Sequence, residues 1–564
     1  ILGKIYANSV LLGDDGPDGW GVKYAQGDFN MTSDSKLFPP RPVWEAEGYR
    51  PDEYSRWLLG DWRPIEELWA ELGIDFRPDP SGPGANPNLI VNPNSVVPVE
   101  VELEDWLFDT TAGPERRMAE ARFVHGHLLK PGDVARTDWR LRCAQWPYDS
   151  LPVPRADIPA GIILSREAVA WIREEHVEDI ALPLYQGVMM SILNPYAARH
   201  VAGVGANAVW DRSLSGPGLV NPAFLIDLAK AKDSRKWSPV PRLAYRRIAR
   251  TTDVRTVIAT ALMDLPAGDS LFFYVPPDEE PNRALSLAAA MSSFWYDHQL
   301  RLRLGGTNLS DFIMAETAVP RPRSKDGLVS LGAGLTLYSV RDASTWLSIT
   351  NEGRANRARW YIRPHSRLEK RTSLDAIVAV EFGMAPDDVR SVLDDCDLPS
   401  SAVSAQTSGL RPTGFWRVDK DKDPELRHTV LTLVAFHDLE EKIRACGGDR
   451  EAGIEAFLGQ NDGEGWMLPE TLRLADYGLG RDERARHPQP VASRLGPRFY
   501  DWQLAQSAEE SWRECHLHAR NLLGKGGYRE LAELSPSGDP GHIAAHVPRD
   551  RSDVVGHPQD SLFE

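Results

Sequence analysis

The sequence predicts a mixed α/β fold, in which an α+β region is followed by a mainly helical C-terminal region. Val254–Met263 and Ser270–Val275 are apolar, rich in β-branched or aromatic residues and separated by a Pro-Ala-Gly-Asp turn, which is typical of two strands. Arg283–Leu304 contains helix-forming residues throughout and ends at two glycines, which stop a helix. Pro424–Cys446 has apolar residues at helical spacing.

The remaining elements follow from the same patterns. The first 150 residues are rich in Trp, Pro, Gly and Asp, and they predict a loop, a short helix and two strands, at Arg77–Pro98, Glu115–Ala121, Val99–Leu103 and Arg122–Leu129. Three further strands are expected in the middle of the chain, at Leu335–Val340, Trp346–Asn351 and Arg359–Arg363. Four further helices are expected in the last third, at Arg450–Leu458, Glu470–Tyr477, Ser507–Leu523 and Tyr528–Leu534.

Composition limits the class of protein. The 564 residues are 42% hydrophobic and 26% charged, as in soluble globular proteins. No apolar run reaches the roughly 18 residues needed to cross a bilayer, so no membrane partner is expected. The four cysteines lie far apart and form no Cys-x-x-Cys pair. This pattern argues against a disulfide framework and favours the reducing cytoplasm.

Two stretches contain candidate metal ligands. Cys515, His516 and His518 fall in a predicted helix, where neighbouring positions point in different directions. His125 and His127 have no third ligand near them in the sequence. Neither stretch has the spacing of a zinc site, so the sequence predicts no metal ligand.

The charge is distributed unevenly along the chain. The formal net charge of −17 argues, taken alone, against nucleic acid as a partner. Residues 235–371, however, contain 21 Lys/Arg against 13 Asp/Glu. A basic middle inside an acidic protein is typical of a local surface for a polyanion. The alternative is a basic segment neutralised by acidic side chains that fold onto it from elsewhere.

Two stretches of this basic middle carry residues suited to DNA. Arg242–Thr256 has five arginines with interleaved hydroxyls, which suit phosphates and guanine edges; the alternative is a solvated basic edge. Arg301–Asn308 places two arginines near the end of a helix, followed by Gly-Gly, which permits close backbone approach. Thr307 and Asn308 then cap the next element, and the alternative here is ordinary loop geometry.

A third stretch, Asn221-Pro222-Ala223-Phe224, differs by one residue from the Asn-Pro-Pro-Phe/Tyr tetrapeptide that binds the target amine in adenine methyltransferases. That chemistry needs a Gly-rich cofactor turn between a strand and a helix. The local candidate, Val201–Gly205, follows no apolar strand. The tetrapeptide is therefore interpreted as a turn that leads into the packed residues Leu225 and Ile226.

Five segments are similar, in their residues and in their order along the chain, to segments of one protein family. They are Trp20–Tyr24 (WGVKY), Asn30–Phe38 (NMTSDSKLF), Leu184–Met190 (LYQGVMM), Arg247–Ala259 (RIARTTDVRTVIA) and Ser293–Leu309 (SFWYDHQLRLRLGGTNL). They resemble the C-terminal half of large bacterial adenine-specific N6 DNA methyltransferases. These are the type IIG restriction–modification enzymes and the related BREX and phage-growth-limitation methyltransferases. The resemblance covers residues 20–322, and residues 330–564 follow by continuation only.

The chain departs from the family in two respects. Gln186 and Val188 replace the acidic and basic residues usual in the third segment, which puts charged contacts there in doubt. In the family, the catalytic tetrapeptide and cofactor turn precede the first segment, and only 19 residues precede Trp20 here. We therefore expect no catalytic or cofactor-binding residue in this chain. By resemblance, residues 1–180 are a connector after the methyltransferase core, 181–375 the target-recognition region and 376–564 the mainly helical C-terminal region.

The resemblance implies the DNA-recognition and C-terminal portion of a site-specific adenine-N6 methyltransferase in a restriction–modification or phage-defence system. The full-length parent would use S-adenosylmethionine and act on a base flipped from double-stranded DNA. The arginines are expected to meet phosphates, and the threonine and asparagine to approach base edges. The expected DNA-binding residues are Arg246, Arg247, Arg250, Arg255, Arg301, Arg303, Thr307 and Asn308.

Two other functions are alternatives to this one. In the first, the protein is an interaction module whose helical region 424–534 docks onto other defence-system proteins without direct DNA contact. In the second, it is an autonomous nuclease, which is not expected because no Pro-Asp…(Asp/Glu)-x-Lys cluster stands in a strand context.

Overall fold

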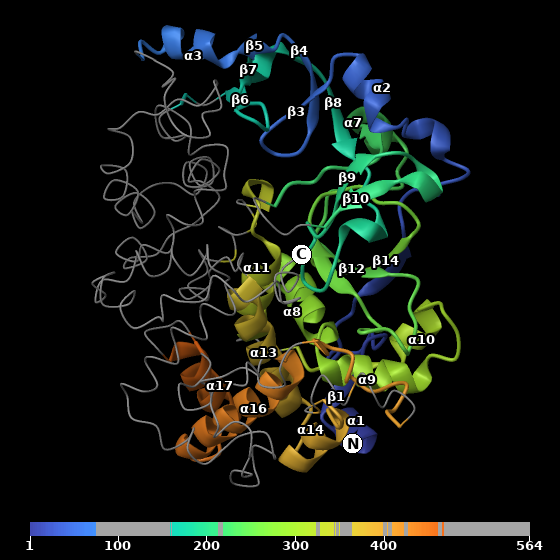
Figure 1. The fold of residues 1–564 in the computed structure, drawn as a ribbon, viewed down its shortest axis with the longest axis vertical. Coiled ribbons are helices and arrows are strands. Elements are labelled where there is room, and N and C mark those ends of the chain that lie inside the picture. Colours follow the sequence, from blue (N-terminus) through green and yellow to red (C-terminus); the bar gives the residue numbers. More distant parts are fainter. Residues whose placement is uncertain are drawn as a thin grey trace, which may run out of the picture.

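The computed structural model describes residues 1–74, 158–159, 161–212, 218–322, 327–342, 345, 349, 364–396, 398, 403, 409–421, 427–460 and 465–466. Its described part has the predicted mixed α/β fold, with helices and antiparallel sheets. Figure 1 shows the larger helices gathered in the lower half of the view and most of the strands above and beside them. The main hydrophobic core runs from Ile5 to Trp466, so both ends of the described chain contribute to it.

The first four-stranded sheet lies against the large helices. Its strands, in spatial order, are β13 (Ala259–Leu262), β12 (Arg242–Arg246), β14 (Leu271–Val275) and β2 (Lys23–Gln26), and each pairs antiparallel with its neighbour. Residues that point to either face of β12 and β14 are buried. On one face of the sheet, α8 packs against β12 and β13. The predicted strand Ser270–Val275 is confirmed as β14. The strand predicted at Val254–Met263 is shorter, because Arg255 and Thr256 are bound by a helix side chain before β13 begins.

The other strands form smaller antiparallel groups. They are the sheet β11 (Leu225–Asp227), β8 (Val177–Pro183), β4 (Trp57–Gly60) and β3 (Arg50–Pro51); the sheet β5 (Arg63–Pro64), β7 (Ala170–Arg173) and β6 (Ile162–Leu164); and the pairs β1 (Ser9–Leu11) with β15 (Ala318–Pro320) and β9 (Arg199–Ala202) with β10 (Val209–Asp211). Strands from residues 1–74 therefore take part in four of the five sheets or pairs of the described residues, each together with strands that begin at residue 162 or later.

The large helices pack mainly on one another and on the first sheet. They are α8 (Pro281–Met291), α9 (Phe294–Arg303), α11 (Gly327–Thr336), α13 (Pro364–Glu381), α14 (Pro386–Val392), α16 (His428–Ala445) and α17 (Arg450–Gly459). α8 packs on α11, α13 on α16, and α16 on α17. The short helices are α1 (Leu2–Ala7), α2 (Arg41–Ala46), α3 (Ile65–Glu71), α7 (Leu228–Asp233) and α10 (Asp311–Ala315), and the 3-10 turns are η1 (Ser35–Leu37), η4 (Glu174–His176), η5 (Gly187–Met189), η6 (Gly205–Asn207) and η7 (Val340–Asp342).

The helix predictions have mixed outcomes. Helices α16 and α17 confirm the predictions at Pro424–Cys446 and Arg450–Leu458. The single helix predicted at Arg283–Leu304 is interrupted, because the Ser293 hydroxyl accepts a hydrogen bond from the Tyr296 backbone N–H and starts α9 as a new helix.

The strand predicted at Leu335–Val340 is wrong. Its first residues end helix α11, and residues 340–342 form η7. Close packing accounts for the helix: a Cβ added at Gly332 would lie 2.7 Å from the Leu285 carbonyl oxygen of α8. A buried apolar segment of this length has no period that separates strand from helix.

The sequence-based domain boundaries cut across this structure. The boundary at residue 180 falls inside β8, which pairs with β4 from the first 74 residues. The boundary at residue 375 falls inside α13, which packs on α16. The elements predicted at 77–98, 99–103, 115–121, 122–129, 359–363, 470–477, 507–523 and 528–534, and nearly all of 346–351, lie outside the described residues.

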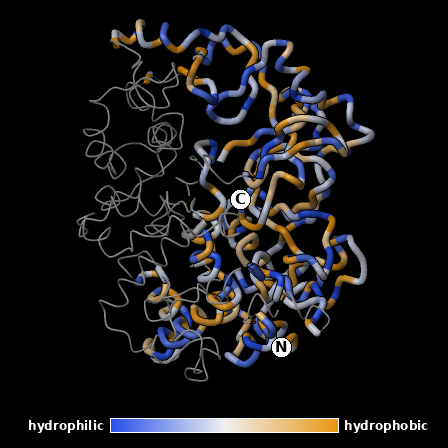
Figure 2. Tube along the Cα trace, viewed as in Figure 1, coloured by the Kyte–Doolittle hydropathy of each residue, from blue (hydrophilic) through white to orange (hydrophobic). Residues whose placement is uncertain are grey.

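None of the described helices has both the length and the apolar content required to cross a bilayer. In Figure 2 hydrophobic and hydrophilic residues alternate along the described tube, as expected of helices and strands that bury one face.

Candidate nucleic-acid interface

The arginine-rich segment and the Gly-Gly-Thr-Asn loop, which are remote in sequence, lie side by side. Ile248 forms an antiparallel bridge with Asn308. The Ala249 backbone N–H donates to the Thr307 carbonyl at 2.9 Å, and the Leu309 N–H donates to the Arg247 carbonyl at 2.9 Å. These two backbone hydrogen bonds form the bridge and fix the two segments against each other.

The placement follows from the elements that carry these segments. β12 ends at Arg246, and the chain leaves the sheet at Arg247. Helix α9 ends at Arg303, and its chain then turns back through Gly305 and Gly306. A Cβ added at either glycine would meet nothing within 4 Å, so the loop is open to an approaching partner.

Four of the eight predicted residues are exposed on these paired segments, and we call them the 247–308 surface: Arg247, Arg250, Thr307 and Asn308. The Arg247 guanidinium lies over the Phe272 ring at 5.5 Å, which steadies it without neutralising its charge. Arg303 is also exposed, but it donates to Glu316 at 2.7 Å and lies over the Tyr6 ring.

Apolar side chains accompany this surface. Ile248 is 61% exposed, although it forms the bridge to Asn308, and Phe312, on the short helix α10, is 73% exposed. Asp311, which precedes Phe312, accepts a hydrogen bond from the Tyr274 hydroxyl at 3.1 Å. The surface therefore combines cations, amide and hydroxyl groups, and two exposed apolar side chains.

Two of the predicted DNA contacts are instead buried around one carboxylate. Asp297 of α9 is fully buried and accepts hydrogen bonds from Arg255 Nε at 2.9 Å and Arg301 Nε at 2.8 Å. Burial raises the pKa of Asp297, but Arg255 and Arg301 outweigh it, so the pKa is lowered overall. Arg301 also donates to the carbonyls of Asp253 and Val254. Arg255 and Arg301 are thus structural, because an ion pair in the core occupies both guanidinium groups.

A third predicted contact, Arg246, also points inward. Its Nε donates to the Gly187 carbonyl at 2.7 Å, and a terminal nitrogen donates to the Met190 carbonyl. Burial lowers the pKa of its guanidinium. Arg246 therefore holds η5, within the family-like segment Leu184–Met190, against the first sheet.

Part of the basic surplus of residues 235–371 is neutralised by acidic side chains from outside this stretch. Arg242 donates to Asp28 at 2.8 and 2.6 Å, and Lys236 donates to Asp34 at 2.7 Å. Both aspartates come from the first 40 residues, so acidic side chains do fold onto the basic middle from elsewhere. The exposed positive charge is consequently smaller than the sequence count suggests.

The near-motif Asn221-Pro222-Ala223-Phe224 is a structural junction. The Asn221 side-chain oxygen accepts from Arg41 at 2.6 Å and from Arg166 at 3.0 Å, while its amide nitrogen donates to the His200 carbonyl at 2.7 Å. Leu225, which follows in β11, is fully buried. The interpretation of this stretch as a packed turn agrees with these contacts.

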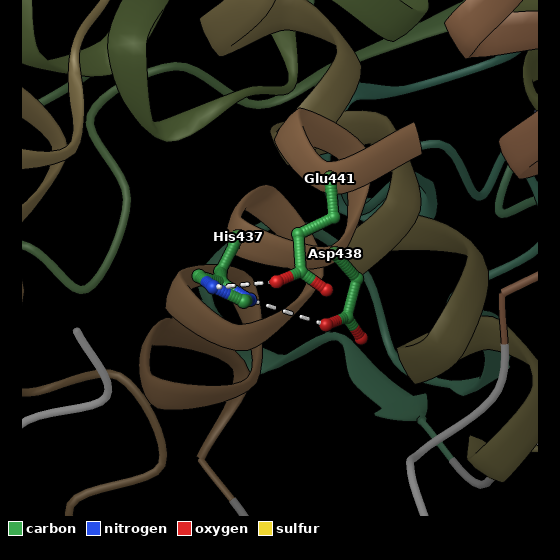
Figure 3. Close-up of side chains that lie close together, drawn as sticks. All are labelled: His437, Asp438 and Glu441. Carbon is green, nitrogen blue, oxygen red and sulfur yellow. Dashed lines mark hydrogen bonds and ion pairs between the residues drawn. The ribbon is translucent and has the colours of Figure 1, made fainter. Parts of the chain in front are cut away.

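A cluster of titratable groups lies on α16 (Figure 3). His437 Nδ1 is 3.4 Å from an Asp438 carboxylate oxygen, and Nε2 is 3.5 Å from Glu441. The Trp466 indole N–H donates to the other Asp438 oxygen at 3.0 Å. Since each ring nitrogen faces a different carboxylate, the geometry suits two separate imidazole–carboxylate contacts better than three ligands around one cation. The stretches at 125–127 and 515–518 lie outside the described residues.

Sequence reasoning missed Asp297, and it interpreted Asn221 as part of a turn without foreseeing that Asn221 binds Arg41 and Arg166. A signal for Asp297 was present, because Asp297 and Arg301 are four residues apart on a predicted helix and such pairs interact. The partners of Asn221 come from three distant segments and left no local signal. No known protein family, curated protein or solved structure matches this chain.

Proposed function

We propose that this chain supplies DNA recognition for a site-specific adenine-N6 DNA methyltransferase of a restriction–modification or phage-defence system, with S-adenosylmethionine as the methyl donor of the enzyme to which it belongs. The observation that carries the proposal is the Ile248–Asn308 bridge. It joins the two segments that resemble the family most specifically, and it does so at the protein surface.

The chemistry of the 247–308 surface supports duplex DNA as the ligand. Arg247 and Arg250 offer guanidinium groups to backbone phosphates, which supply most of the affinity of such interfaces. Thr307 and Asn308 offer a hydroxyl and an amide, groups that read base edges in the major groove. Gly305 and Gly306 leave room beside them.

The test is fluorescence anisotropy of a labelled duplex with the full chain at several salt concentrations. We expect affinity to fall steeply as salt rises, since bound phosphates release counterions. The double variant Arg247→Ala/Arg250→Ala should bind more weakly with a shallower slope. The matched control is Lys230→Ala/Lys232→Ala, which removes two exposed charges from α7, a helix packed on the β11–β8 sheet away from α9 and α10 (Figure 1). Absence of salt-dependent binding by the unchanged protein would overturn the proposal.

A second candidate, a protein-interaction module, is favoured by one observation. Ile248 lies between Arg247 and Arg250 in the sequence and is 61% exposed, and Phe312, four residues after Asn308, is 73% exposed; exposed apolar residues often mark protein contacts. The sequence suggests the helical region 424–534 for this role, and part of that region lies outside the described residues. Association with a sibling defence protein that survives high salt, is lost in Phe312→Ala and occurs without DNA binding would favour this function.

A further inference from the structure

Two arginines from distant segments share one neutral acceptor. Arg41, at the start of α2, and Arg166, after β6, each donate a terminal N–H to the Asn221 side-chain oxygen, at 2.6 and 3.0 Å. The Asn221 amide nitrogen donates to the His200 carbonyl at 2.7 Å, which fixes the amide so that its oxygen faces the arginines. The two guanidinium groups are therefore held close together at the junction around Asn221.

Glu45 pairs with Arg41 only, and none of the described carboxylates pairs with Arg166. Arg166 also donates to the Val220 carbonyl at 2.9 Å and lies over the Trp57 ring, and it has no ion pair with any carboxylate of the described residues. Arg41 Nε is 3.4 Å from Glu45, whose side chain is 42% exposed. Asp52, a buried carboxylate that acts electrostatically on Arg166, is bound by Arg56 at 2.7 Å.

The lowered pKa of Arg166 and the N–H groups of Arg41 and Arg166 that make no hydrogen bond both indicate a site for an anion. The pKa of Arg166 is lowered to about 10, first because burial disfavours its charged form, and further because Arg41 and Arg199 are like charges; Glu167 and Asp52 oppose this shift without offsetting it. The Nε–H groups of Arg41 and Arg166 are both buried and make no hydrogen bond within the described residues, although Arg41 Nε lies 3.4 Å from Glu45. A buried N–H without a partner costs free energy that an anionic oxygen would recover.

We propose that Arg41 and Arg166, positioned by Asn221, form an oxyanion site that takes a phosphate group. A guanidinium group presents a planar fork of N–H donors that matches phosphate oxygens, and two such groups place donors on more than one oxygen. Arg41 keeps 13% of its side chain exposed, so the cluster is reached from solvent at that side. The phosphate belongs either to the backbone of bound DNA or to a small phosphate-bearing molecule.

Thermal unfolding of the full chain tests the site directly. Sodium phosphate is titrated at constant ionic strength against chloride, with Arg41→Gln and the control Arg63→Gln, whose arginine is 35% exposed and already paired with Glu67 and Glu71. We expect a saturable rise in Tm for the unchanged protein and for the control. In Arg41→Gln the apparent phosphate affinity should fall by roughly tenfold or more, the size of a lost charged hydrogen bond. General salt effects act equally on all three proteins.

Two results would overturn the proposal: no saturable rise in the unchanged protein, or the same rise in Arg41→Gln. Arg41→Gln is preferred to Arg166→Gln because Arg166 is the more deeply enclosed of the two and its loss threatens folding. A further variant, Arg41→Lys, keeps the charge but loses the planar fork. Intermediate phosphate affinity in this variant supports bidentate recognition, and affinity equal to that of the unchanged protein counts against it.

DNA binding in phosphate-free buffer identifies the source of the phosphate. If the DNA backbone is the ligand, Arg41→Gln lowers the salt slope of duplex binding by about 1 and inorganic phosphate competes with the duplex. If the slope is unchanged while the Tm rise depends on Arg41, the ligand is a small phosphate-bearing molecule. A protein that binds phosphate but no DNA keeps this site and contradicts only the function proposed above.

Discussion

Ile248 and Asn308 form an antiparallel bridge that unites two loops from different ends of one packed unit. One loop extends strand β12, and the other follows helix α9, whose residue Asp297 binds Arg255 at the far end of the first loop. The loop from Arg247 to Val254 is thus held at its start by the bridge region and at its end by the buried ion pairs. Such a loop presents its exposed side chains from a rigid base, as recognition requires.

The first prediction concerns a single charge on this surface. Arg250→Ala should reduce the salt slope of duplex binding by about 1 and weaken binding to all duplex sequences nearly uniformly, because a phosphate contact carries no sequence information. Anisotropy titrations with two unrelated duplexes measure both effects. A sequence-dependent loss would instead assign Arg250 to a base edge.

The second prediction concerns the buried carboxylate. Asp297→Asn leaves two buried guanidinium groups without their anion, and the free energy of unfolding should fall by about 3–5 kcal/mol. Urea unfolding measures this loss. The control Glu316→Gln breaks the exposed pair with Arg303 and should cost less than about 1 kcal/mol. Equal losses in the two variants would mean that the Arg255–Asp297–Arg301 cluster contributes no more than a surface pair.

The fold was predictable where local pattern and tertiary context agree. The run of aromatic and aliphatic residues at β14 predicts a strand, and the helical spacing of apolar residues at α17 predicts a helix; the structure has both elements. At the apolar run 335–340, predicted as a strand, the first two residues instead end helix α11, whose Gly332 packs closely on α8. The break between α8 and α9 depends on one serine that caps a helix instead of continuing it.

The candidate interface was predictable in its exposed residues but not in its division of roles. Residue type alone treats Arg247 and Arg255 alike, yet Arg247 is exposed and Arg255 is buried against Asp297. Arg255 is buried because it meets a carboxylate of helix α9, which is distant in the sequence. No spacing of residues near Arg255 predicts this contact. Counting charge by sequence window failed for the same reason, since Asp28 neutralises Arg242 across the fold.

The third prediction separates structure from catalysis at the near-motif. Asn221→Ala removes the acceptor shared by Arg41 and Arg166, so the free energy of unfolding should fall by roughly 1–3 kcal/mol for the stranded donors. The control Asn308→Ala, on the exposed surface, should change stability by less than about 0.5 kcal/mol. Loss of methyl transfer by Asn221→Ala in the full-length parent, with folding and DNA binding intact, would contradict the structural role.

The fourth prediction is a pH dependence that originates at Asp342. This carboxyl group is buried, and it accepts a hydrogen bond from the Tyr196 hydroxyl. Burial raises its pKa to about 7, although Arg341 and Tyr196 favour the charged form. Between about pH 4 and pH 7 the folded protein therefore holds a proton on Asp342 that the unfolded chain has released, so the contribution of Asp342 to stability is largest at the acid end of this window and falls as pH rises.

The size of this effect and its control follow from the same linkage. The shift from 3.8 to about 7 corresponds to a loss of up to about 4 kcal/mol across the window, measured by urea unfolding at a series of pH values. Asp342→Asn cannot ionise and keeps an acceptor for Tyr196, so the unfolding free energy of the unchanged protein relative to this variant should fall across the window. The difference isolates Asp342, because His298, whose pKa burial lowers to about 4, contributes with the opposite sign in both proteins. Asp253→Asn, on the exposed loop, should keep the pH dependence of the unchanged protein. A difference between the unchanged protein and Asp342→Asn that does not vary with pH would contradict the prediction.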